Sequence, residues 1–233
     1  MKALEQLSPE LRTALAKKIE GMLSPERVER IDTVLTQRTR HITVVLEDIF
    51  QPHNASACLR SCECFGVQDV HILESLAKFR PNEDIAVGAA QWLTLHKYFR
   101  HEPEAQSRML ATLKERGYRL VATSPSSDAP SLDELSLDQP LAIAFGTEQT
   151  GLSKELMAAA DGLVRIPMHG FTQSFNVSVS VALCLYEMTT RLRRMPINWR
   201  ITETESAELR FRWLVSALPN RHSVINPLLE RLV

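Results

Sequence analysis

The sequence predicts an α/β fold with a mainly parallel sheet that carries helices on both faces. Short runs of β-branched and aliphatic residues, such as residues 42–47 and 140–145, are nearly continuous in apolar character, which is typical of strands buried on both sides. Stretches with helical periodicity lie between these runs, and this alternation favours a parallel sheet. The chain has 233 residues, 44% of them hydrophobic, enough for one medium-sized domain with shorter appendages.

Each element of the central region follows from its local pattern. Gly66 and Gly117 are suited to end two helices, and Ser153 is suited to begin a third. We expect strands at residues 42–47, 70–73, 119–123, 140–145 and 163–166. We expect helices at residues 54–65, at 104–116, from 153 onward and at 175–194.

Both ends of the chain are predicted to be helical. Apolar residues three or four apart predict a helix over residues 4–22, and Ser24-Pro25-Glu26 is typical of the start of a second helix that ends near residue 37. A last helix is expected near residues 205–218. The predicted organisation is a basic helical extension (1–41), an α/β domain (42–194) and a second basic helical extension (195–233).

The net charge of −1 is unevenly distributed. Residues 1–41 hold eight Lys or Arg and six Asp or Glu, residues 188–233 hold eight arginines and four glutamates, and the stretch between them is acidic. Basic ends suit a polyanion such as RNA, because arginine binds phosphate through paired hydrogen bonds. Ordinary solvated helix faces would give the same composition.

Cysteine spacing and hydropathy argue against several classes of protein. Cys58, Cys62 and Cys64 are too close together for a conventional disulfide framework, and their spacing matches no common zinc pattern. We interpret them as packed helix residues and expect no metal. No apolar run is long enough to span a bilayer, and the charged N-terminus does not resemble a signal peptide. We therefore expect a cytoplasmic protein that does not enter a membrane.

Clusters of polar residues follow three of the predicted strands, where open α/β sheets bind ligands. The first cluster, residues 51–60, contains Asn54, placed to cap the next helix, and Arg60, suited to hold a phosphate or a hydroxyl. The second, residues 145–153, is a polar loop between two glycines, which let a backbone approach a ligand closely.

The third cluster, residues 166–178, is long for a connection inside an α/β unit. Ser174 is placed to cap the following helix, with Asn176 in its first turn. Helix capping and a surface salt bridge would account for several of these side chains. Phosphate-loop and dinucleotide-binding motifs are missing, so the residues alone indicate a ligand site without naming the ligand.

In this order and spacing, the three clusters resemble the three motifs of the SpoU/TrmH family of SPOUT methyltransferases. Residues 52–60 resemble motif 1, residues 145–153 motif 2, and residues 166–178, with Ser-x-Asn-Val-Ser, motif 3. The resemblance covers about residues 25–194 and is closest to enzymes that methylate the ribose of guanosine 18 in the tRNA D-loop. It implies S-adenosylmethionine as the cofactor, a C-terminal deep trefoil knot, and a homodimer with the site near its interface.

The resemblance also implies roles for individual residues. Arg60 is implied to assist loss of the 2′-hydroxyl proton; because a guanidinium is a poor base at neutral pH, we expect it to stabilise the forming alkoxide while another group accepts the proton. The other residues implied in catalysis are Asn54, Glu148, Ser174 and Asn176. The residues expected around the cofactor are Thr123, Phe145, Gly146, Glu148, Gly151, Ile166, Met168, Phe175 and Val177. The residues expected to contact RNA are Arg27, Arg30, Arg38, His53, Arg193 and Arg194.

Two alternative functions stay open at this point. The first is a ribosomal RNA 2′-O-methyltransferase of the same superfamily, although such enzymes often carry a longer N-terminal domain than the 41 residues before the first predicted strand. The second is a non-catalytic RNA-binding factor on the same scaffold, against which the presence of Arg60, Glu148, Ser174 and Asn176 argues. The basic ends disfavour a small-molecule methyltransferase.

Overall fold

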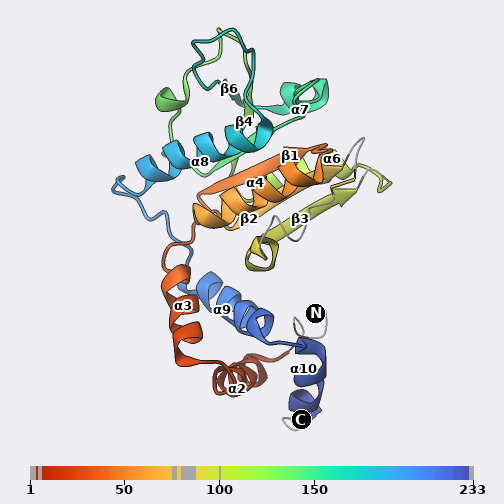
Figure 1. Ribbon diagram of the computed structural model, residues 1–233, viewed down its shortest axis with the longest axis vertical. Helices are drawn as coiled ribbons and strands as arrows, with labels where there is room; N and C mark the ends of the chain where they lie inside the picture. Colours follow the sequence, from red (N-terminus) through yellow and green to blue (C-terminus); the bar gives the residue numbers. More distant parts are fainter. Residues whose placement is uncertain (1–3, 5–6, 75–77, 80–87, 100, 231–233) are drawn as a thin grey trace. The chain divides into compact units, whose positions relative to one another are not determined.

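The computed structural model describes residues 4, 7–74, 78–79, 88–99 and 101–230, which form two compact units (Figure 1). The described parts of residues 1–38 and 200–233 form the helical unit, and residues 39–199 contain the sheet unit. The two ends of the chain therefore fold together, which the sequence did not indicate.

The sheet unit contains six described strands, all parallel, in the order β3-β2-β1-β5-β4-β6. They are β1 (Ile42–Glu47), β2 (Asp69–Glu74), β3 (Thr94–Phe99), β4 (Arg119–Thr123), β5 (Leu141–Phe145) and β6 (Gly162–Val164). In register, Val44 of β1 lies between Val70 of β2 and Ile143 of β5. Every residue of β1 and β5 is buried, which explains their nearly continuous apolar sequences.

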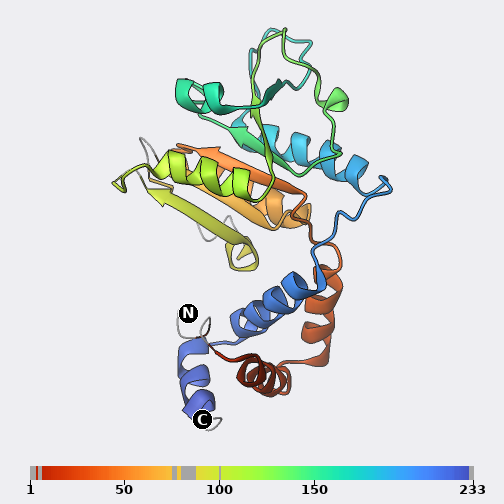
Figure 2. The ribbon, with the colours of Figure 1, turned by 180° about the vertical axis from the view of Figure 1, so that it is seen from behind.

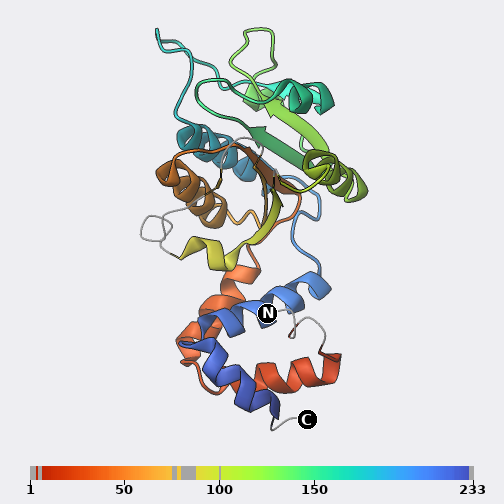
Figure 3. The same ribbon diagram turned by 90° about the vertical axis from the view of Figure 1, so that its right-hand side faces the viewer.

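Helices cover both faces of this sheet, as predicted (Figures 2 and 3). On one face lie α4 (Pro52–Cys64) and α8 (Val177–Leu192), and on the other lie α6 (Ala105–Glu115) and α7 (Lys154–Ala159). The strands divide their side chains between two apolar clusters, since Val44 belongs to the first and Val45 to the second.

Two strands differ from the prediction. The sequence did not predict β3, whose residues are of mixed polarity and mostly half-buried at an edge of the sheet. β6 ends at Val164, before the predicted residues 165 and 166, because the backbone of Arg165 bonds elsewhere. Its N–H donates to the Pro130 carbonyl at 2.9 Å, and its carbonyl accepts from the Leu132 N–H at 3.0 Å. The short helices η1 (Ala89–Trp92) and η2 (Leu132–Glu134) were not predicted either.

The helical unit consists, where described, of α2 (Pro9–Glu20), α3 (Pro25–Leu35), α9 (Glu203–Ala217) and α10 (Arg221–Glu230). Ser24 caps α3 as predicted, its hydroxyl accepting the Arg27 N–H at 3.3 Å. Ser8 caps α2, so this helix begins later than predicted; residues 1–3 and 5–6 of that prediction lie outside the described residues. The sequence did not predict α10. No helix in the described ranges is both long and apolar enough to cross a membrane.

Arginine side chains form part of the interior of the helical unit. Arg38 has no exposed surface, and its guanidinium lies 4.9 Å from the centre of the Trp213 ring. The prediction that Arg38 contacts RNA is therefore wrong, because a fully buried side chain cannot reach a phosphate. Arg210 binds Asp32 through two hydrogen bonds, of 2.6 and 3.1 Å, and also binds Glu20.

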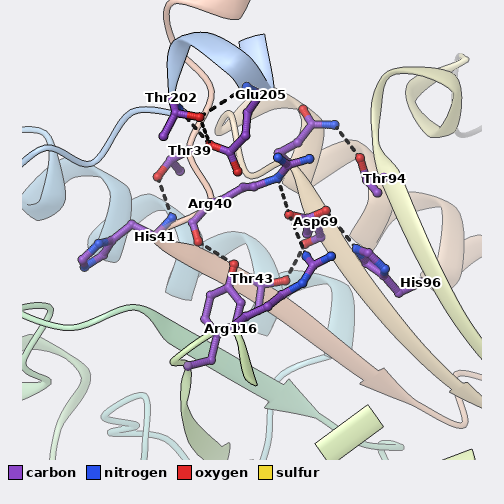
Figure 4. A network of polar contacts seen from close by, with 12 residues as sticks. Thr39, Arg40, His41, Thr43, Asp69, Thr94, His96, Arg116, Thr202 and Glu205 are labelled. Atoms are coloured by element: carbon purple, nitrogen blue, oxygen red, sulfur yellow. Dashed lines mark hydrogen bonds and ion pairs between the residues drawn. The ribbon is translucent and has the colours of Figure 1, made fainter. Parts of the chain in front are cut away.

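The amino end of β2 holds a buried ion cluster (Figure 4). The Asp69 carboxylate has no exposed surface and lies 2.7 Å from Arg40 Nε, 2.9 Å from His96 Nε2 and 3.7 Å from Arg116 Nη1. Burial alone would raise the pKa of Asp69, but the hydrogen bond from His96 and the charges of Arg40, His96 and Arg116 lower it overall. The cluster joins β2, β3 and the end of α6 at the amino edge of the sheet.

Candidate functional site

The carboxyl ends of β4, β5 and β6 surround a pocket of about 350 Å³. All nine residues expected around the cofactor line it, together with Ser174. These residues are Thr123, Phe145, Gly146, Glu148, Gly151, Ile166, Met168, Phe175 and Val177. The pocket lies where ligands bind in open α/β sheets, and it draws on the second and third polar clusters of the sequence.

One wall of the pocket is the loop of residues 146–152, which is closed on itself. Thr147 and Gly151 exchange backbone hydrogen bonds of 3.1 and 3.0 Å, and Gly151 has a φ of 70°, which favours glycine. A Cβ at Gly146 would lie 2.2 Å from the Gly151 carbonyl oxygen. Only glycine fits at position 146, so the backbone itself forms this wall.

Asn54, Glu148 and Asn176 form a polar cluster, the Asn–Glu–Asn cluster, that joins the three sequence motifs. The Asn176 Nδ2 donates to Asn54 Oδ1 at 3.1 Å and to Glu148 Oε1 at 3.2 Å. The Asn54 Nδ2 also donates to Glu148 Oε1. Glu148 Oε1 therefore accepts hydrogen bonds from both amide groups, while Glu148 Oε2 has no hydrogen-bond partner within the described ranges.

The structure corrects two predicted helix caps. α4 begins at Pro52 after Gln51, because proline suits the first helical position, so Asn54 lies in the first turn and its amide is free for Glu148. Asn176, rather than Ser174, caps α8, and its Oδ1 accepts the Ser178 N–H at 3.0 Å. The Asn176 side chain therefore caps α8 with its oxygen and joins the Asn–Glu–Asn cluster with its nitrogen.

Arg60 is not in contact with the Asn–Glu–Asn cluster. It lies on the exposed side of α4, six residues beyond Asn54, which places the two side chains about 120° apart around the helix. Its side chain makes no hydrogen bond or ion pair with any residue that the structure describes. His53 is exposed beside Asn54, at the start of the same helix.

The remaining residues expected to contact RNA lie on exposed surfaces of the two units. Arg27 and Arg30 are exposed on α3. Arg193 and Arg194 are exposed at the end of α8, where Arg193 donates to the Phe65 carbonyl at 2.9 Å and lies 5.5 Å from the Trp199 ring centre. Arg193 therefore has a packing role as well as an exposed charge.

Cysteine side chains near the site are packing residues. Cys58, Cys62 and Cys184 are buried, and burial raises the pKa of Cys58 and of Cys184 to about 12, so both thiols stay protonated at neutral pH. Among the residues that the structure describes, no three His, Cys, Asp or Glu side chains are grouped so that they could hold a metal ion.

Sequence reasoning missed several residues around the pocket. The missed lining residues include Ser124, Pro125, Gln173 and Ser180. Ser124 and Pro125 directly follow β4, so their position after a strand was the signal that could have identified them. Glu47 was also missed; a charge at the end of the apolar run 42–47 was its signal.

Comparison with known proteins identifies the family. Residues 41–186 match the SpoU rRNA Methylase family. The tRNA (guanosine(18)-2'-O)-methyltransferase of Borreliella burgdorferi is 42% identical over 208 residues, covering 89% of this chain and 93% of that protein. The protein of the same name from Thermus thermophilus is 38% identical over 161 residues, covering 69% and 80%. The structure resembles that of the A. aeolicus TrmH/SpoU tRNA modifying enzyme with a TM-score of 0.72 and 28% identity, covering 83% of this chain and 98% of that one. This chain therefore belongs to the SpoU methylase family.

Proposed function

We propose that this protein transfers a methyl group from S-adenosylmethionine to the 2′-oxygen of a tRNA ribose, at guanosine 18 of the D-loop. The observation that carries the proposal is the convergence of the three motifs on one pocket and one polar cluster. The choice of substrate follows the relatives, which are named for guanosine 18 and include one that this chain matches over 93% of its length.

The pocket fits a donor of this kind. Its volume of about 350 Å³ lies in the usual range for small-ligand sites. Gly146 and Gly151 leave backbone groups facing the pocket, while Phe145, Ile166 and Val177 add apolar surface. When bound, S-adenosylmethionine supplies a methyl group activated by the adjacent sulfonium. We further propose that the loops around the pocket form the trefoil knot that the family resemblance implies.

The Asn–Glu–Asn cluster is suited to hold the ribose. Asn54 and Asn176 fix Glu148 through one oxygen, which leaves Glu148 Oε2 to accept a hydrogen bond from a ribose hydroxyl. Ser174, exposed at the pocket, is placed to contact the same sugar. Arg60 supplies positive charge for the forming alkoxide when the RNA is bound.

We propose that the protein works as a homodimer through the outer face of α8. Val179, Leu183 and Tyr186 recur every three or four residues along α8 and are 43%, 39% and 59% exposed, and Phe175, just before the helix, is 40% exposed. A contiguous exposed apolar stripe of this kind is typical of an interface. Because α4 packs beside α8, a second copy on this stripe would lie close to the helix that carries Arg60.

Exposed basic side chains are proposed to bind the tRNA backbone. They are Arg27, Arg30, Arg193 and Arg194, with His53 beside the polar cluster. Each phosphate contact would make binding weaker as salt rises, with a logarithmic slope of about −0.7 to −0.9 per contact. We propose that the protein acts in the cytoplasm, where its folded tRNA substrate is found.

The test is a methyl-transfer assay with radiolabelled S-adenosylmethionine, followed by mapping of any 2′-O-methyl group. The substrates are an unmodified tRNA transcript, the same transcript with adenosine at position 18, and ribosomal RNA. The variants are Glu148→Ala and Arg60→Ala. We expect label only on the transcript with guanosine 18, and a loss of at least about 100-fold in both variants, the size of effect typical for removing a transition-state contact.

Other outcomes separate the alternatives. Transfer to ribosomal RNA but not to tRNA would overturn the substrate and leave the reaction. Full activity of Arg60→Ala would remove that residue from the mechanism. Absence of donor binding by the wild-type protein would overturn the enzymatic function and leave a non-catalytic RNA-binding factor.

A further inference from the structure

Glu47, the last residue of β1, is a buried carboxylate that the chemistry above does not use. The residue is only 2% exposed. Its Oε2 accepts the Ser153 N–H at 2.7 Å, whereas its Oε1 is buried and makes no hydrogen bond with the described residues. Burial raises the pKa of Glu47, the hydrogen bonds from Ser153 offset part of that rise, and the nearby carboxylates of Asp48 and Glu155 add to it. A half-satisfied buried carboxylate disfavours folding, and such exceptions to good packing occur mainly at functional sites.

The hydrogen bond from Ser153 ends the loop that forms one wall of the pocket. Residues 146–152 begin directly after β5 and are held in the middle by the contacts of Glu148 with the two asparagines. Leu152, which lines the pocket, is followed by Ser153, the cap of α7. Since β1 pairs with β5 in register, Leu46 with Phe145, Glu47 lies directly beside the strand from which the loop departs.

We propose that Glu47 is a positioning residue for the methyl donor, which holds the end of the 146–152 loop against β1 and so sets the backbone that faces the donor. The inference rests on the proposed function, because it takes the pocket to be the donor site. Glu47 does not line the pocket, so it acts through Ser153, whose backbone N–H it accepts. Without this bond, the loop would keep its internal closure but lose its attachment to the neighbouring strand.

Two matched pairs of variants test this role. Glu47→Ala removes the acceptor, while Glu47→Gln keeps a carbonyl oxygen for the Ser153 N–H. Ser153→Pro removes the N–H at a residue whose φ of −60° suits proline, while Ser153→Ala keeps the N–H and removes only the hydroxyl. Glu155→Gln, which removes a nearby exposed charge, is the control. Titration calorimetry with S-adenosylmethionine gives the donor Kd, and steady-state kinetics give the separate KM values for donor and tRNA.

We expect Glu47→Ala and Ser153→Pro each to raise the donor Kd by about tenfold, with little change in the KM for tRNA. Glu47→Gln and Glu155→Gln should stay within about twofold of the wild type, and Ser153→Ala should lose less than Ser153→Pro. The Glu47→Ala/Ser153→Pro double variant should bind no more weakly than either single variant, because both remove the same hydrogen bond.

The inference is overturned if Glu47→Ala binds the donor like the wild type, or if the two losses multiply in the double variant. Equal losses in the KM for donor and for tRNA would also overturn it, because they indicate a general structural defect. If Glu47→Ala does not fold, the Ser153 pair still decides between the outcomes. Failure of the wild-type protein to bind S-adenosylmethionine would instead contradict the proposed function itself.

Discussion

The amino edge of the parallel sheet, where the strands begin, and the carboxyl edge, where they end, each hold a buried carboxylate. The pKa values of these two carboxylates are shifted in opposite directions. Asp69, at the amino end of β2, is surrounded by Arg40, His96 and Arg116, and these partners lower its pKa despite burial. Glu47, at the carboxyl end of β1, is hydrogen-bonded only by Ser153 among the described residues, and burial raises its pKa. The difference therefore lies in the partners and not in the depth of burial.

This contrast separates stability from function within one sheet. The amino edge satisfies its charge with ion pairs that tie β2, β3 and the end of α6 together. The carboxyl edge contains the pocket, a loop in which only glycine fits at position 146, and polar groups with unused hydrogen-bonding capacity. Polar groups without partners lower the stability of the fold, but a ligand needs such groups for its own hydrogen bonds. Substitutions at the amino edge should therefore affect stability, and substitutions at the carboxyl edge should affect ligand binding.

The largest effect is expected for Asp69→Asn. Removing the charge leaves Arg40 and Arg116 without their buried partner, and breaking such a cluster costs about 3–5 kcal/mol of unfolding free energy. Urea unfolding measures this loss, with the exposed Asp128→Asn as a control expected to change stability by less than about 0.5 kcal/mol. At a temperature where the variant is folded, its affinity for S-adenosylmethionine should be unchanged. A weaker donor affinity with normal stability would show that the two edges are not separate in function.

The next effect is expected for Gly146→Ala, and it should fall on binding. The added Cβ would overlap the Gly151 carbonyl, so the loop must open and the pocket wall must move. We expect the donor Kd to rise by about 100-fold, which corresponds to about 2.7 kcal/mol. Gly162→Ala, where a Cβ meets no atom within 4 Å, is the matched control. Normal donor binding by Gly146→Ala would mean that the 146–152 loop does not form the donor site.

The sequence predicted the sheet well where local pattern and burial agree. β1 and β4 have the predicted bounds, because their central residues are buried on both faces of the sheet and are mostly apolar. The sequence did not predict β3, because a strand at the side of a sheet needs no continuous run of apolar residues. It also did not predict the burial of Arg38, because that burial depends on Trp213, which is far away in the chain. The composition of the site was predictable from motifs. The contacts of Asn54 with Glu148 and Asn176 were not, because they join residues far apart in the chain.

A change in pH should have a smaller effect on the free energy of unfolding, and the effects at the two edges should have opposite signs. The lowered pKa of Asp69 means that its stabilisation is complete above about pH 4 and is lost as pH falls through the folded-state pKa. The raised pKa of Glu47 means that its cost appears as pH rises above about 4 and the buried carboxyl ionises. Relative to the wild type, Glu47→Gln should therefore become more stable as pH rises. Urea unfolding between pH 4 and 8 measures the difference, and a constant difference across this range would contradict it.

The smallest effect concerns a neutral pair beside the ion cluster. His71 is buried, burial and the nearby His96 lower its pKa to about 3, and its Nδ1 lies 3.2 Å from the Tyr98 hydroxyl. Because His71 is uncharged and the other partner of the Tyr98 hydroxyl is the Thr112 side chain, Tyr98→Phe removes only neutral hydrogen bonds and should cost about 1 kcal/mol, well below the loss in Asp69→Asn. Thermal unfolding of the two variants side by side gives the comparison. An equal loss in both would mean that the amino edge depends on the whole polar network, and that the ion pairs of Asp69 are not its main source of stability.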